Sequence, residues 1–160
     1  MFKEKNLCMS NPVHLLATGF GSGLSSFAPG TMGSLAAIPF WFVLIALPNP
    51  FYIICLILSF GFGIYLCGRT AKEMGVDDPG CIVWDEFVGL WITLSLLPKE
   101  AHTLLWITVG FLLFRLFDIW KPFPIRVIDR HVRGGVGIML DDVIAGFFAA
   151  MMLFLFHRFL

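Results

Sequence analysis

Charged residues gather in one stretch of the sequence, FRLFDIWKPFPIRVIDRHVRGGVGIMLDDVIAG, which runs from residue 114 to residue 146. It contains five of the eleven basic residues and four of the eleven acidic ones: Arg115, Lys121, Arg126, Arg130, Arg133, Asp118, Asp129, Asp141 and Asp142. Carboxylate oxygens are the ligands that Mg²⁺ prefers, and basic side chains hold phosphate oxygens. This mixture predicts a metal-assisted site for a phosphate-bearing substrate.

A second acidic pair, Asp85 and Glu86, interrupts the start of an apolar run. Two carboxylates at the edge of hydrocarbon are costly unless a cation or a metal pairs with them, although a helix N-terminus favours anions. Adjacent helical positions diverge by about 100°, so both side chains cannot point identically at one ion. We expect one to ligate a metal and the other to orient it or to bind water. Helix capping alone is the alternative.

Arg115 and Asp118 are three residues apart, so they share a helical face and can pair with each other. The alternative is that Asp118 serves a metal while Arg115 and Lys121 hold phosphate oxygens. Both alternatives are compatible with the spacing.

Asp141 and Asp142 directly precede another apolar run, where we expect them at a helix N-terminus. Asp129 and Arg130 would supply a base, an anion clamp or only a solvated loop, and Asp129 ranks below the other aspartates. An oxygen-only cage for Mg²⁺ would draw on Asp85, Glu86, Asp118, Asp141 and Asp142.

A glycine-rich segment, TGFGSGLSSFAPGTMGS, occupies residues 18–34 and holds five glycines. Backbone N–H groups in such a loop can wrap an anion when a helix N-terminus follows. We expect Thr31 or Ser34 to cap a helix that begins at Leu35. The segment lacks the GK[ST] of a Walker A loop, and a flexible connector is the alternative.

The composition places these residues in a membrane protein. The 160 residues are 58% hydrophobic and 14% charged, with a mean hydropathy of +0.86, whereas soluble domains are about half apolar and about a quarter charged. The length predicts a single domain over residues 1–160. Zero net charge gives no bulk attraction to nucleic acid.

Five apolar runs must position the site, at residues 35–47, 51–67, 81–97, 104–120 and 143–156. They are shorter than the roughly 20 residues of a full span, but a bilayer can thin around them. We therefore predict an all-α, polytopic membrane helical bundle of about four to five short hydrophobic helices. A soluble all-helical bundle is the alternative, although five such runs leave little polar surface.

The distribution of Lys and Arg predicts the orientation of this bundle. If the first run leaves the cytoplasm, alternation places nine of the eleven basic residues inside and only Lys99 and Arg158 outside. The glycine-rich segment, the 85–86 pair and the 114–146 stretch then share the cytoplasmic face. The predicted site is thus built there from loops and helix ends.

Four motifs resemble those of the phosphatidylglycerophosphatase A family in order and spacing: GFGSGLSSFAPGTMGSLAAIP, IVWDEFVGLWITL, FRLFDIWKPFPIRVIDR and GGVGIMLDDVIAG. The resemblance covers residues 9 to about 150, with Ser26-Phe27 standing where a Pro is expected. It implies a Mg²⁺-dependent, multi-pass phosphatase of the bacterial inner membrane. Such an enzyme converts phosphatidylglycerophosphate into phosphatidylglycerol and phosphate.

The resemblance also implies roles for individual residues. Metal or catalytic roles fall to Asp85, Glu86, Asp118, Asp141 and Asp142, and catalysis itself to Asp85, Asp118 and Asp142. Phosphate-binding roles fall to Thr31, Gly30, Gly33, Arg115 and Lys121. Arg130, the anion clamp suggested above from the sequence alone, is added to this set. Metal-activated water is the expected nucleophile, with a covalent aspartyl-phosphate as the alternative.

Two other functions remain compatible with membrane carboxylates. An ion or proton transporter would place acids near the midplane and often shows inverted repeats; the sequence shows no repeat, and its acids cluster at one edge. A non-catalytic membrane subunit would need a constant protein partner, and no obligate partner is evident from the sequence.

Overall fold

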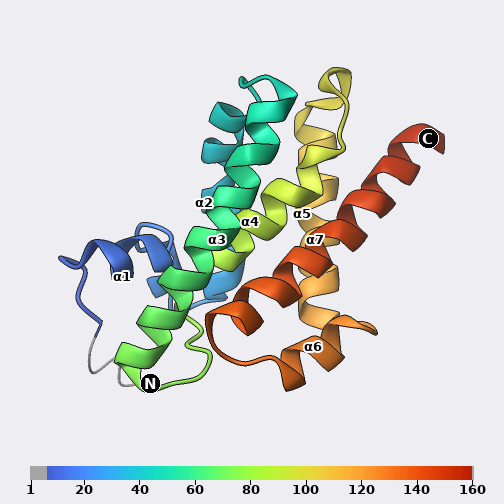
Figure 1. The fold of residues 1–160 in the computed structure, drawn as a ribbon. Helices are drawn as coiled ribbons and strands as arrows, with labels where there is room; N and C mark the ends of the chain where they lie inside the picture. Colours follow the sequence, from blue (N-terminus) through green and yellow to red (C-terminus); the bar gives the residue numbers. More distant parts are fainter. Residues whose placement is uncertain (1–6, 160) are drawn as a thin grey trace.

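The computed structural model describes residues 7–159, and every regular element in that range is a helix (Figure 1). The α-helices are α1 (Pro12–Ala17), α2 (Pro29–Leu44), α3 (Asn49–Met74), α4 (Trp84–Ser95), α5 (Leu104–Trp120), α6 (Ile125–His131) and α7 (Gly134–Phe159). Two short 3-10 helices, η1 (Ser22–Leu24) and η2 (Lys99–Ala101), lie in the connections. The predicted all-α class is confirmed.

Local signals account for several of the helix ends. The side chain of Asn11 accepts a hydrogen bond from the N–H of Val13, and Pro12 follows it as the first residue of α1. Helix α3 ends at Met74, and the next residue, Gly75, caps it with a left-handed φ of 69°.

Two of the predicted helix boundaries were wrong. Helices α3 and α7 are each 26 residues long and extend beyond the predicted runs 51–67 and 143–156. Helix α3 continues through its polar end because charged residues there pair along the helix, with Arg69 Nε 2.8 Å from a Glu73 oxygen. The prolines and glycines of residues 121–140 predicted a loop there, but the segment contains α6 and the first turns of α7.

Helices α3 and α7 are long and apolar enough to cross a membrane, whereas α2 is apolar but shorter. Only 22% of the apolar window of α3 is buried within the protein. Its side chains at Ile57 and Leu58 are 64% and 66% exposed. A soluble bundle would bury such a surface, so the exposed apolar face of α3 favours a lipid environment over the soluble alternative.

Helix α4 is the buried centre of the bundle. It packs against α2, α3, α5 and α7, and nearly all of its residues are buried. At 12 residues it is about 18 Å long, which is shorter than the roughly 30 Å of membrane hydrocarbon. In Figure 1, α3 and α7 approach each other near their lower ends and diverge upward, with α4 between them.

The ends of the helices divide into two groups (Figure 1). The connections at residues 45–48 and 96–103 lie at the upper end, together with the end of α7. Helices α1 and α6 lie at the lower end, toward which α5 ends and α7 begins. Segments that are distant in sequence therefore meet at one level.

Candidate active site

A close crossing of α4 and α7 positions the site. A Cβ added at Gly146 would lie 2.5 Å from the carbonyl oxygen of Gly89, so the two backbones touch. The hydroxyl of Thr93 donates to the Gly89 carbonyl at 2.9 Å beside this contact. Asp142 lies one turn before Gly146, and Glu86 lies one turn before Gly89. The crossing therefore brings acidic residues of both helices together.

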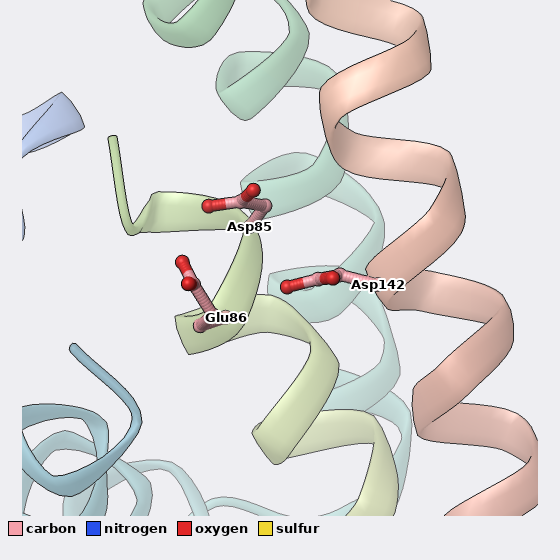
Figure 2. Close-up of side chains that lie close together, drawn as sticks. All are labelled: Asp85, Glu86 and Asp142. Carbon is pink, nitrogen blue, oxygen red and sulfur yellow. The ribbon is translucent and has the colours of Figure 1, made fainter. Parts of the chain in front are cut away.

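Three carboxylates meet at this crossing: Asp85 and Glu86 from the first turn of α4, and Asp142 from α7. One oxygen from each lies within 4.8 Å of the other two. Figure 2 shows the side chain of Asp142 reaching across from α7 toward the start of α4. Three acids this close repel one another strongly unless a cation or protons intervene.

Each carboxylate of this acidic cluster has an oxygen that the rest of the protein leaves unsatisfied. Asp85 Oδ1, Glu86 Oε2 and Asp142 Oδ2 are buried and have no hydrogen-bond partner among residues 7–159. Buried charges are normally paired or bound to a metal. An all-oxygen donor set of this kind fits Mg²⁺, which also keeps several waters. The residues present therefore fit the expected metal.

Arg115 supplies positive charge beside the acidic cluster. Its Nη1 lies 2.6 Å from Asp118 Oδ2 and 3.7 Å from Glu86 Oε1. The structure thus contains the Arg115–Asp118 pair that the spacing allowed. Both side chains are largely buried, with 14% and 12% exposed. Asp118 holds the guanidinium next to the cluster, where it can contact an anion.

The N-terminus of α2 completes this side of the site. A Cβ at Gly30 would collide with the Glu86 carboxylate and would lie 3.0 Å from both terminal nitrogens of Arg115. Only glycine permits this approach. The first N–H groups of a helix lack intrahelical partners, so those of Gly30 and Thr31 are available to an anion.

Lys121 and Asp141 form a second charged group, next to the acidic cluster. The ammonium of Lys121 contacts Asp141 and lies 2.8 Å from Asp129 Oδ1. Burial lowers the pKa of Lys121, but these two carboxylates outweigh burial and raise it above its usual value. Lys121 is therefore positively charged at neutral pH and is engaged by carboxylates in this structure.

Arg130 lies farther out. It is exposed on α6 and lines a polar cleft of about 220 Å³ between α6, α7 and the connection before α4. Asp129 and Asp141 line the same cleft, but none of the three clustered carboxylates does. The structure therefore separates Arg130 from the acidic cluster.

Several expected positions were wrong. Asp141 and Asp142 do not cap a helix, because α7 begins at Gly134 and they lie two turns inside it. Thr31 and Ser34 do not cap α2, which begins at Pro29. Gly33 packs its Cα against the Val83 side chain, and its phosphate-binding role stays a prediction. The structure also brings oxygens of both Asp85 and Glu86 into one cluster despite their angular divergence.

The glycines at the helix crossing were missed by sequence reasoning. Gly89 follows Glu86 by three residues and Gly146 follows Asp142 by four, so each acid has a small residue one turn later. Small residues at helical spacing let apolar helices approach closely. This shared pattern, an acid followed one turn later by a glycine, is the sequence signal that would have predicted contact between the two helices.

Comparison with known proteins identifies relatives along nearly the whole chain. The family model described as phosphatidylglycerophosphatase A matches residues 15–157. A protein of that name from Escherichia coli (strain K12) is 56% identical over 151 residues, covering 94% of this chain and 87% of the relative. Another of that name from Haemophilus influenzae is 48% identical, covering 94% and 91%. No solved structure matches.

Proposed function

Because the chain belongs to the phosphatidylglycerophosphatase A family, we propose that it hydrolyses the phosphomonoester of phosphatidylglycerophosphate to phosphatidylglycerol and phosphate. It is accordingly a phosphoric monoester hydrolase. The observation that carries this conclusion is the cluster of three carboxylates with unsatisfied oxygens beside Arg115. Acids alone would repel a phosphate, but acids together with a cation and a guanidinium would bind one.

Asp85, Glu86 and Asp142 are the residues that would hold Mg²⁺. Bound there, Mg²⁺ would supply positive charge toward an anionic substrate and acidify water for in-line attack on phosphorus. The protein contributes the rest of the site. The crossing at Gly89 and Gly146 sets the separation of the carboxylates, and the bundle excludes bulk water from their buried oxygens.

Arg115 and the start of α2 would bind the phosphomonoester. The guanidinium presents several N–H donors and stays charged, and the N–H groups of Gly30 and Thr31 point outward from a helix N-terminus. Asp118 would act by holding Arg115 in place. Lys121 and Arg130 would bind substrate charges farther from the reacting phosphorus.

We also propose that this single domain is a multi-pass protein of the bacterial inner membrane with four to five spans. The apolar, largely exposed surface of α3 and the apolar helices α2 and α7 support this proposal. So does the excess of basic residues on the segments at the lower end in Figure 1. On that orientation the site faces the cytoplasm.

The test is phosphate release from phosphatidylglycerophosphate by the purified protein in detergent micelles. We expect turnover with Mg²⁺, none with EDTA, and recovery when Mg²⁺ is added in excess. Substitution of Asp142 by Asn should remove activity while the protein keeps its helical circular-dichroism spectrum. A folded wild-type protein that releases no phosphate with any divalent cation would refute the proposed function.

A further inference from the structure

A large apolar groove opens between α3, α4 and α7. Its volume is about 730 Å³, and its walls include Leu56, Ile57 and Phe60 of α3 and Val143 and Phe147 of α7. It occupies the region where α3 and α7 diverge in Figure 1. None of the residues assigned to phosphate or metal lines it.

The inner end of the groove adjoins the acidic cluster. Val143 directly follows Asp142 in α7. On α3, Phe60 follows Ser59, whose carbonyl accepts a hydrogen bond from Trp84 Nε1 at 3.1 Å, and Trp84 directly precedes Asp85. On one wall, Val143 is therefore the sequence neighbour of a cluster carboxylate, and on the other, Phe60 is connected to the start of α4 through the hydrogen bond between Ser59 and Trp84.

The groove then runs away from the cluster toward the opposite end of the bundle. Along α3 it extends from Phe60 to Asn49, which is about 16 Å at 1.5 Å per residue. That length is roughly half of the 30 Å hydrocarbon thickness, or one leaflet. The side chains of Asn49, Lys99 and His102 lie at the far end of the groove, and its inner part is apolar.

These features match the shape of one kind of ligand. A phospholipid whose phosphate lies at the acidic cluster must extend its acyl chains from the cytoplasmic edge into the hydrocarbon of the membrane. The groove begins next to the cluster, runs away from it for a distance similar to the depth of one leaflet, and presents apolar walls where the chain would lie.

We propose that this groove holds an acyl chain of the lipid whose phosphomonoester is hydrolysed at the acidic cluster, an inference that rests on the proposed function. A chain already in hydrocarbon gains no hydrophobic transfer energy by entering the groove. Its effect is to fix the depth and orientation of the headgroup relative to Asp85, Glu86 and Asp142. Placement of this kind is worth large factors in rate.

A matched pair of substitutions on α3 tests the proposal. Ile57 lines the groove and is 64% exposed; its neighbour Leu58 is 66% exposed and does not line it. Ile57→Trp fills the groove, and Leu58→Trp adds the same bulk to the lipid-facing surface beside it. Both lie outside the residues assigned to metal and phosphate.

The kinetics of each protein are measured with two substrates, dipalmitoyl and dibutanoyl phosphatidylglycerophosphate, because butanoyl chains are too short to fill the groove. With the dipalmitoyl lipid, we expect Ile57→Trp to lower kcat/KM about tenfold relative to Leu58→Trp. With the dibutanoyl lipid, both variants should match the wild type.

Three results would overturn the proposal: equal kinetics for the two variants on the dipalmitoyl lipid, an equal loss on both lipids for Ile57→Trp, or a change in oligomeric mass confined to Ile57→Trp. The last would identify the groove as an interface between copies. Failure of the proposed function is distinguishable, because the wild type would then release phosphate from neither lipid.

Discussion

The Cα of Gly146 in α7 lies directly against the carbonyl oxygen of Gly89 in α4, with no room for a side chain between them. One turn before each glycine stands an acid, Asp142 in one helix and Glu86 in the other. The separation of the carboxylates therefore depends on the closeness of two backbones. Substitutions at these glycines should therefore change the separation of the carboxylates, although they replace no residue that binds metal or substrate.

Gly146→Ala should lower kcat/KM by about a hundredfold, because the new Cβ forces α7 away from α4 and displaces Asp142. The measurement is phosphate release by detergent-purified protein. Gly61→Ala is the control, since a Cβ at Gly61 meets nothing within 4 Å. Wild-type activity in Gly146→Ala would show that the crossing does not set the site.

Asp142→Asn should lower kcat by about 10³-fold, because it removes a charge that would bind the cation, and cation stabilisation of the transition state is worth several kcal/mol. Asp118→Asn should also impair activity, through the loss of its 2.6 Å ion pair with Arg115. Asp77→Asn, at a side chain that is 81% exposed, is the control. Full activity in both Asp142→Asn and Asp118→Asn would refute the assigned site.

Mg²⁺ should raise the thermal unfolding temperature of the wild-type protein, because a ligand that binds only the folded state adds about 2.7 kcal/mol of stability at one hundred times its Kd. The double variant Asp85→Asn/Glu86→Gln should lose this response. This measurement needs no substrate, so it separates metal binding from catalysis. An identical Mg²⁺ response in the double variant would place the metal elsewhere.

Gly30→Ala should raise KM about tenfold, because its Cβ would collide with Glu86 and crowd Arg115 at the proposed phosphate site. Gly80→Ala provides a control in a connection where a Cβ meets nothing within 4 Å. Substrate titrations of both variants would test this. The idea fails if Gly30→Ala has the KM of the wild type.

Lys121→Gln should destabilise the folded protein by about 2 kcal/mol, because it leaves the carboxylate of Asp141, a residue that is 6% exposed, without its cation. The raised pKa of Lys121 means that its stabilisation is complete below the unfolded-state pKa and is lost only as the pH rises through the higher folded-state value. The difference between wild type and variant should therefore persist up to pH 9, where Lys121 is still charged. Thermal unfolding at several pH values measures it, with Lys121→Arg as the charge-preserving control.

The helical class and the chemistry of the site follow from local features of the sequence. Long apolar runs without alternation predict helices, and Asn11-Pro12 marks the start of α1 as observed. Asp85 and Glu86 lie in the first turn of α4, as expected. The spacing of Arg115 and Asp118 allowed the pair that the structure contains. Each of these features depends on residues within about one helical turn of each other.

The tertiary structure decided which acids meet. Sequence spacing shows that Asp141 and Asp142 face different directions, but it does not show that Asp142 joins Asp85 and Glu86 while Asp141 faces Lys121. The start of α7 was also not predicted, since Gly134 and its neighbouring glycines suggested a loop. These outcomes depend on how α7 packs against its neighbours. The sequence determined which chemical groups the protein carries and which helices bear them; the crossing at Gly89 and Gly146 decided which groups share a site, because such contacts join residues that are distant along the chain.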